Sequence, residues 1–215
     1  MNSSDIFLSL LQAAIYWYSF GFAVIPIIPG SKLPAVKWDP WLDAISQASI
    51  STYWALHPDH ELGFIVGDGV IVFDADSPEA IAALASLEKT FDLTPTLTIT
   101  TSKGVHHYYR RAPDTYAKGD SHSTEKHPER IDVKTGRALV ILPPSTGKEV
   151  DIDECEDVSE LTDAPQAFVD AVFRHNGRPA PRARSIAPPP PMTGVQDEDI
   201  SQLSALVGCT PRLRI

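Results

Sequence analysis

The stretch Val70-Ile71-Val72-Phe73-Asp74-Ala75-Asp76 decides the fold, because an apolar run ends there in two acids. A short apolar run bounded by turn residues predicts a β-strand. Side chains alternate along a strand, so Asp74 and Asp76 share one face while Phe73 and Ala75 take the other. The stretch therefore predicts a buried strand that delivers two carboxylates to one side of a sheet.

Two carboxylates this close repel each other unless a cation lies between them. Mg²⁺ prefers oxygen ligands and keeps waters or substrate phosphates as its remaining ligands, so it is one such cation. The alternative is a solvated strand end with helix-capping acids, because Asp76 precedes Ser77-Pro78 at a predicted helix start. An Asp-x-Asp motif alone leaves both interpretations open.

The surrounding sequence predicts an α/β protein, in the α+β sense. The Gly67-Asp68-Gly69 turn predicts a hairpin between strands 62–66 and 70–74. Further predicted elements are helices at about 6–20, 50–56, 79–89 and 164–175, strands 22–28, 96–101, 105–110, 130–134 and 138–142, and a long loop 112–129.

Two other strands carry candidate site residues. In 130–134, Arg130, Asp132 and Lys134 alternate onto one face, where Asp132 supplies a third carboxylate and the cations lie near phosphate oxygens. The alternative is a surface strand with ordinary cross-strand charge pairs.

In 105–110, His106 and Arg110 share a face and follow the Ser102-Lys103-Gly104 turn. Both side chains donate hydrogen bonds to anions, and Gly104 allows close backbone approach to a ligand, so the segment is a candidate triphosphate site. A single strand histidine is, alternatively, a structural residue.

Residues 6–28 contain no charged side chain and are long enough to span a bilayer. Polar residues, Gly21 and Pro26 interrupt this segment, and Asp5 replaces the positive charge of a secretory signal. We therefore expect a buried helix, capped by Ser4 and ending at Gly21, and no membrane association.

The order of these motifs resembles the bifunctional DNA primase/polymerase (prim-pol) family of the archaeo-eukaryotic primase superfamily. The motifs are the strand with Asp74 and Asp76, His106-His107-Tyr108-Tyr109-Arg110, and Ile131-Asp132-Val133-Lys134 followed by Pro143-Pro144-Ser145. Upstream, the segment 29–34, Trp38 and the segment 54–64 also look like this family, so the likeness covers about residues 10–150.

The resemblance implies a primase-like catalytic core with an RRM-like antiparallel sheet and an N-terminal α/β module. It implies two Mg²⁺ or Mn²⁺ ions held by Asp74, Asp76 and Asp132, and nucleotide contacts from His106 and Lys134, with Arg110 and Ser102 as further candidates. The chain departs from the superfamily in having Asp76 where Glu is frequent and Gly104 where Ser is frequent. No zinc is expected, because His122 and His127 have no nearby cysteine.

The implied function is template-dependent synthesis and extension of primers on single-stranded DNA from NTPs or dNTPs, in phage or plasmid replication. We expect residues 1–175 to form the catalytic domain, 176–196 a Pro/Arg-rich linker and 197–215 a further helical segment or tail, joined to or working with a replicative helicase. The alternatives are a metal-dependent nuclease or phosphohydrolase, and a non-catalytic single-stranded-DNA-binding domain.

The net charge of −10 does not exclude nucleic acid, because basic residues outnumber acids from Lys103 to Arg137 while the acids concentrate after Lys148. The cysteines, Cys155 and Cys209, are only two and lie far apart, which fits a reducing cytoplasm.

Overall fold

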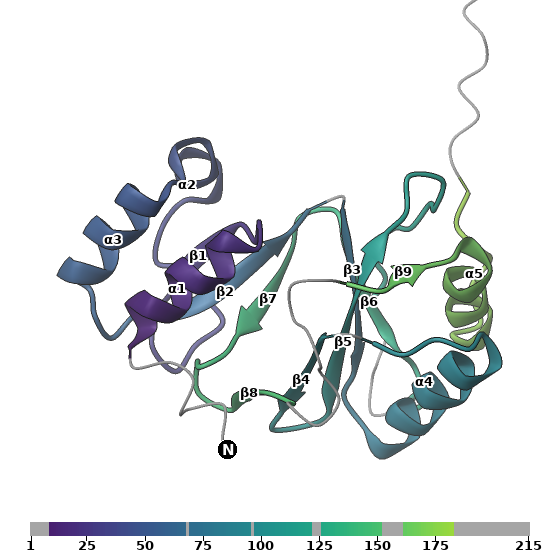
Figure 1. The fold of residues 1–215 in the computed structure, drawn as a ribbon. Coiled ribbons are helices and arrows are strands. Elements are labelled where there is room, and N and C mark those ends of the chain that lie inside the picture. Colours follow the sequence, from purple (N-terminus) through teal and green to yellow (C-terminus); the bar gives the residue numbers. More distant parts are fainter. Residues whose placement is uncertain (1–8, 68, 96, 122–125, 152–160, 183–215) are drawn as a thin grey trace, which may run out of the picture. The chain divides into compact units, whose positions relative to one another are not determined.

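The computed structural model describes residues 9–182, except 68, 96, 122–125 and 152–160. The described part holds five helices and nine strands in two sheets (Figure 1). The helices are α1 (Leu10–Ser19), α2 (Trp38–Ala44), α3 (Gln47–Leu56), α4 (Pro78–Thr90) and α5 (Gln166–His175). The strands are β1 (Val24–Ile27), β2 (Glu61–Val66), β3 (Val70–Ala75), β4 (Leu97–Thr101), β5 (Val105–Arg111), β6 (Asp132–Lys134), β7 (Ala138–Leu142), β8 (Lys148–Val150) and β9 (Asp163–Ala164).

The larger sheet has the strand order β6-β3-β5-β4-β8, with every neighbouring pair antiparallel, and β9 adds to β5 in parallel. Helices α4 and α5 cover one face of it (Figure 1). Phe168 on α5 packs against Phe73 and Tyr109, with ring centroids 5.0 and 5.6 Å apart. The α+β class and the antiparallel core sheet predicted from the sequence are thus confirmed.

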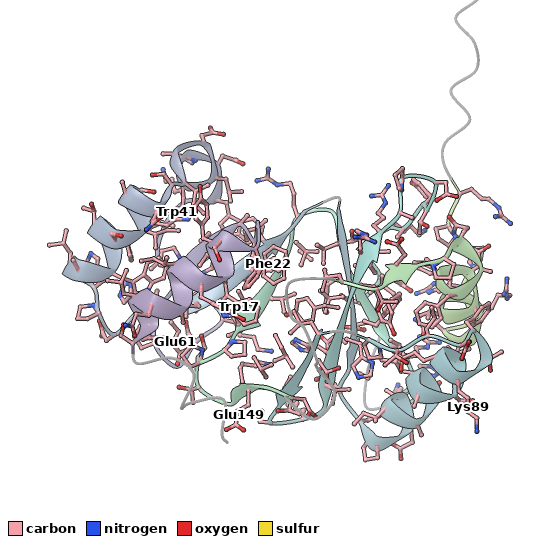
Figure 2. The ribbon with its side chains drawn as sticks, viewed as in Figure 1. Trp17, Phe22, Trp41, Glu61, Lys89 and Glu149 are labelled. Carbon is pink, nitrogen blue, oxygen red and sulfur yellow. The ribbon has the colours of Figure 1, made fainter. Side chains whose placement is uncertain are left out.

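The smaller sheet has the order β1-β2-β7 and packs with α1 and α3 in a second apolar core. Trp17 of α1 stacks on Phe22, which stacks in turn on Phe64, with centroid distances of 5.5 and 4.4 Å (Figure 2 labels Trp17 and Phe22). This core continues into Val72 and Tyr108 on the free face of the larger sheet. The face that carries Asp74 is therefore covered in part by the N-terminal elements.

The predicted hairpin between residues 62–66 and 70–74 is wrong. Both strands form, but β2 pairs with β1 and β7, whereas β3 pairs with β5 and β6. Both edges of β2 and both edges of β3 are therefore occupied by other strands, and the chain passes from the smaller sheet to the larger one between Val66 and Val70. Asp68 lies outside the described residues.

Helix ends differ modestly from the predictions. The side chain of Ser9 caps α1 by accepting a hydrogen bond from the Gln12 amide, and Ser4 lies outside the described residues. Helix α3 begins at Gln47, three residues before the predicted start, because Ser46 and Ser49 form a capping box. Helix α2 and strands β8 and β9 are short elements that the sequence pattern did not indicate.

In the described part of the chain, no helix is both long enough and apolar enough to cross a membrane. Helix α1 has ten residues, and Ala13, Ala14 and Trp17 are buried in the protein core.

Packing continues past the predicted start of the linker at residue 176. Asn176 is 2 % exposed, and its side chain bonds both the amide and the carbonyl oxygen of Ile131 at 3.0 and 2.7 Å. Residues 183–215 lie outside the described residues.

Candidate active site

Three candidate residues form a row across three neighbouring strands of the larger sheet, from the edge strand β6 through β3 to β5. Asp74 of β3 lies opposite His106 of β5 on one side and opposite Asp132 of β6 on the other. Because facing residues on neighbouring strands project to the same side of a sheet, the register sets their side chains next to one another. The Nε2 atom of His106 is 3.5 Å from Oδ1 of Asp74.

Asp74 is 8 % exposed, and burial raises the pKa of its carboxyl above the ordinary value. The charge of Lys134 opposes this rise, and the like charge of Asp132 adds to it. Burial also raises the pKa of Asp76, and the charge of Asp74 adds to this second shift.

Asp76 follows directly after β3, and its side chain does not cap the next helix. Ser77 is the N-cap of α4, because its hydroxyl oxygen accepts a hydrogen bond from the Ala80 amide at 3.0 Å. Asp76 is therefore not the capping acid of this helix. It is exposed, and it lines a cavity together with Asp74.

Lys134 is the counter-ion of two of the acids. Its Nζ atom donates a hydrogen bond to Oδ2 of Asp132 at 2.8 Å and lies 3.5 Å from Oδ2 of Asp74. Burial lowers the pKa of Lys134, but its bond to Asp132 and the charges of both acids outweigh this and raise the pKa overall. The predicted cation thus lies beside the carboxylates, on a strand that is largely buried rather than on a surface strand.

His106 is 5 % exposed and electrically neutral at physiological pH. Burial, followed by the charge of Lys148, lowers the pKa of its imidazole to about 3. Its Nδ1 atom is buried and has no hydrogen-bond partner among the described residues, and the same is true of Oδ1 of Asp74. Polar atoms in such a position are costly unless a ligand satisfies them.

The turn before His106 is held against the end of β3. Thr101 accepts hydrogen bonds at its Oγ1 from the amides of Lys103 and Gly104, at 3.2 and 3.0 Å. A Cβ atom on Gly104 would overlap the carbonyl oxygen of Ala75. The close approach expected of Gly104 is therefore to the chain's own backbone rather than to a ligand, and no serine fits there.

A cavity of about 540 Å³ lies over this part of the sheet. Of the seven site residues predicted from the sequence, five line it: Asp74, Asp76, Ser102, His106 and Lys134. Asp132 does not line the cavity, and its carboxylate is paired with the ammonium group of Lys134.

Arg110 is not brought to this cavity. It lies four residues beyond His106 on β5, opposite Val70, and its exposed guanidinium pairs with Asp163. Arg110 shares a face of β5 with His106, as strand alternation predicted, but it lies too far along the strand to reach the cavity. Arg130, in the loop before β6, is also absent from the cavity lining.

Sequence reasoning missed several residues that line the cavity, notably Lys32, Lys148, Thr146 and Glu61. Glu61 is the buried acceptor that holds the turn 145–147, because its Oε1 binds the amide and hydroxyl of Thr146 at 3.1 and 2.6 Å. A Gly-Lys pair after the Pro143-Pro144-Ser145 turn was the available signal for Lys148.

Metal ligation is not preassembled in the described residues, where no group of three or more His, Cys, Asp or Glu is arranged to hold an ion. The oxygen donors of Asp74 and Asp76 nevertheless have the chemistry of a site for a hard divalent cation. His127 is exposed and pairs with Glu129 at 3.2 Å, and His122 lies outside the described residues.

Comparison with known proteins identifies the family. The model of the Prim-Pol family, described as bifunctional DNA primase/polymerase, N-terminal, matches residues 13–167. This range is more than half of the chain and includes every predicted site residue. A search of curated proteins gives no match. The chain therefore belongs to the bifunctional DNA primase/polymerase family, and it is a nucleotidyltransferase of DNA replication.

Proposed function

We propose that the chain synthesises primers on single-stranded DNA and extends them with NTPs or dNTPs, using two divalent ions at Asp74, Asp76 and Asp132. The observation that carries this proposal is the row Asp132–Asp74–His106 beside a cavity, within a chain of the Prim-Pol family. A template-dependent polymerase needs metal-binding carboxylates, a pocket for the nucleotide and an open path for the template strand on one face of its catalytic sheet.

The donor set fits Mg²⁺ or Mn²⁺. Asp74 and Asp76 offer carboxylate oxygens to the cavity, and the buried Oδ1 of Asp74 has no hydrogen-bond partner in the described part of the chain. Asp132 joins them once Lys134 releases its Oδ2 atom. When bound, two such ions lower the pKa of the attacking 3′-hydroxyl and stabilise the leaving pyrophosphate.

The chain's own residues position the nucleotide. The imidazole of His106 is neutral, so one ring nitrogen donates a hydrogen bond and the other accepts one. We assign the donated bond to a phosphate oxygen of the incoming nucleotide. Ser102 lines the same cavity on the turn before β5, where its hydroxyl is a second donor.

The test is incorporation of labelled nucleotides on a primer–template by Asp74→Asn and Asp132→Asn, with Asp163→Asn as the matched control. Asp163 is an exposed acid away from the cavity. We expect the first two variants to lose at least about 10³-fold in rate and the control to keep it. Unimpaired incorporation by Asp74→Asn contradicts the proposal.

The same assay separates the alternatives. A nuclease or phosphohydrolase releases product without template and nucleotides, and a binding module retains single-stranded DNA without incorporating anything. Product that requires template, nucleotide and divalent ion together supports the polymerase.

We propose further that the chain acts in the cytoplasm, in phage or plasmid replication, beside a replicative helicase. The support is the family alone. Primer synthesis on a forked duplex that rises when the replicon's own helicase is added supports this context, and indifference to that helicase contradicts it.

A further inference from the structure

A buried hydroxyl group on β5 has no hydrogen-bond partner among the described residues. It belongs to Tyr108, whose side chain is fully buried. The next residue, Tyr109, is equally buried on the other face of the strand, yet its hydroxyl donates a hydrogen bond to Glu88 at 2.7 Å. An unpartnered buried hydroxyl is costly. Packing alone would therefore favour phenylalanine at position 108, and the hydroxyl of Tyr108 calls for an explanation beyond packing.

The packing of the Tyr108 ring keeps this hydroxyl inside the protein. Tyr108 lies opposite Val72 of β3 on one side and opposite Leu97 of β4 on the other. Its ring stacks with Phe22 of the N-terminal core, with centroids 6.1 Å apart and planes 15° apart (Phe22 is labelled in Figure 2). A ring held on these sides cannot turn its hydroxyl out to solvent. The hydroxyl therefore needs a partner in the interior of the domain.

Two other buried polar atoms without a hydrogen-bond partner in the described part of the chain lie on the same face of the sheet. They are Nδ1 of His106 and Oδ1 of Asp74. His106 and Tyr108 are alternate residues of β5, and their ring centroids are 6.5 Å apart. Asp74 is the cross-strand partner of His106 and the diagonal neighbour of Tyr108, a separation that aromatic side chains span. The three atoms thus belong to three adjacent side chains.

The hydrogen-bonding capacities of these side chains complement one another. Burial raises the pKa of the Tyr108 hydroxyl and the charge of Asp74 raises it further, so this group is a donor. Nε2 of the neutral His106 ring lies 3.5 Å from Oδ1 of Asp74, an acceptor, which favours the ring proton on Nε2. Nδ1 is then the acceptor of the ring. The hydrogen bond made by one ring nitrogen decides which nitrogen carries the proton, so a donor at Nδ1 would hold this tautomer.

We propose that Tyr108 is a positioning residue for His106. Its hydroxyl donates a hydrogen bond to a buried water, and that water donates to Nδ1 of His106, which keeps the ring proton on Nε2. This inference rests on the proposed function, because it explains how the imidazole donor assigned to the nucleotide is held ready. Tyr108 does not line the cavity, so it acts through His106 rather than on the substrate.

The first experiment reads the His106 ring directly, by NMR of the full chain labelled with ¹⁵N-histidine, without metal or nucleotide. The His106 resonances are assigned by their loss in His106→Gln. We expect the Nδ1 resonance to shift in Tyr108→Phe, because this nitrogen loses its donor. Tyr109→Phe is the matched control, since it removes a buried hydroxyl from the other face of β5, and it should leave the resonance in place. An unchanged Nδ1 resonance in Tyr108→Phe overturns the inference.

The second experiment measures incorporation on a primer–template with varied dNTP. We expect Tyr108→Phe to raise the KM for dNTP about tenfold and to keep kcat within about twofold, because a binding contact loses its alignment. Tyr109→Phe should keep both constants within about twofold. The double variant His106→Gln with Tyr108→Phe should have the KM of His106→Gln alone, because Tyr108 acts only through that ring. Additive losses in the double variant contradict the assignment.

Thermal unfolding of the same variants separates positioning from packing. If the Tyr108 hydroxyl were only an unsatisfied group of the core, Tyr108→Phe would raise Tm and leave the KM unchanged, and this result overturns the inference. Tyr109→Phe should lower Tm while it keeps the KM, which shows that a loss of stability does not by itself change nucleotide binding. The proposed function fails separately, through incorporation that survives Asp74→Asn, whereas the NMR result is obtained without catalysis.

Discussion

Lys134 and Asp132 are two residues apart on one strand, yet they form the ion pair that governs the charge of the candidate active site. Their 2.8 Å contact is possible because alternate residues of β6 project to the same face. The same ammonium group is 3.5 Å from Asp74 on the neighbouring strand. One cation therefore separates two carboxylates that would otherwise repel each other.

Replacement of this cation is expected to destabilise the protein in the absence of metal. In a chelating buffer, Lys134→Gln should lower the free energy of unfolding by about 1–2 kcal/mol, because two partly buried acids lose their partner. Addition of Mn²⁺ should recover part of the loss. Urea denaturation measures both effects, with exposed Lys118→Gln as control; equal stability of Lys134→Gln and wild type contradicts the assigned role.

Gly104→Ala should disturb the junction between β3 and the turn before His106. The added methyl group meets the Ala75 carbonyl, so we expect a loss of about 1–3 kcal/mol in stability and slower incorporation. Gly69→Ala is the matched control, since nothing lies within 4 Å of its added Cβ. Thermal unfolding and incorporation assays on both variants check this, and equal behaviour of the two refutes it.

A buried carboxylate on α4 should contribute strongly to stability. Oε1 of Glu88 is 2.7 Å from both Nδ1 of His107 and the hydroxyl of Tyr109. Tyr109→Phe removes one bond and should cost about 1 kcal/mol, whereas Glu88→Ala leaves the buried Tyr109 hydroxyl and the part-buried His107 imidazole without this partner and should cost about 3 kcal/mol. Urea denaturation gives both values, and Ser86→Ala on the exposed side of α4 is the reference.

Arg110→Ala should retain incorporation to within about twofold of wild type. Its guanidinium pairs with exposed Asp163 outside the cavity, and exposed pairs contribute little to stability. Steady-state kinetics with varied dNTP test this directly. A large rise in KM would restore Arg110 to the nucleotide site.

The boundary of the catalytic domain is expected after Arg182 rather than at residue 176. A chain ending at Arg182 should unfold like the full chain, whereas one ending at His175 loses the two buried bonds between Asn176 and Ile131. We expect the shorter chain to be less stable by about 2 kcal/mol. Differential scanning calorimetry of the two truncations decides the point.

Local rules predicted which face each site residue occupies, because strand alternation needs no knowledge of the partner strand. Because β3 pairs with β5 and β6, the predicted faces bring Asp74, His106 and Lys134 to one cavity. The same rules said nothing of Lys32 and Lys148, which reach the cavity from distant segments. These two lysines reach the cavity only because strands that are far apart in the sequence pair with one another.

The hairpin prediction failed for a related reason. Gly67-Asp68-Gly69 has the composition of a β-hairpin turn, but the composition of a turn indicates only its local backbone geometry. The choice of partner was made by more distant strands, since β1 and β7 flank β2 while β5 and β6 flank β3.

Strand β7 has a consequence for synthesis on the ribosome. It closes the N-terminal sheet by pairing Leu142 with Leu62 and Ala138 with Val66, so this sheet is not finished until the second half of the domain has been translated. Until then β2 exposes an unpaired edge, the form in which strands recruit wrong partners. Release of the nascent chain at a point just before Ala138 should therefore yield an aggregating fragment.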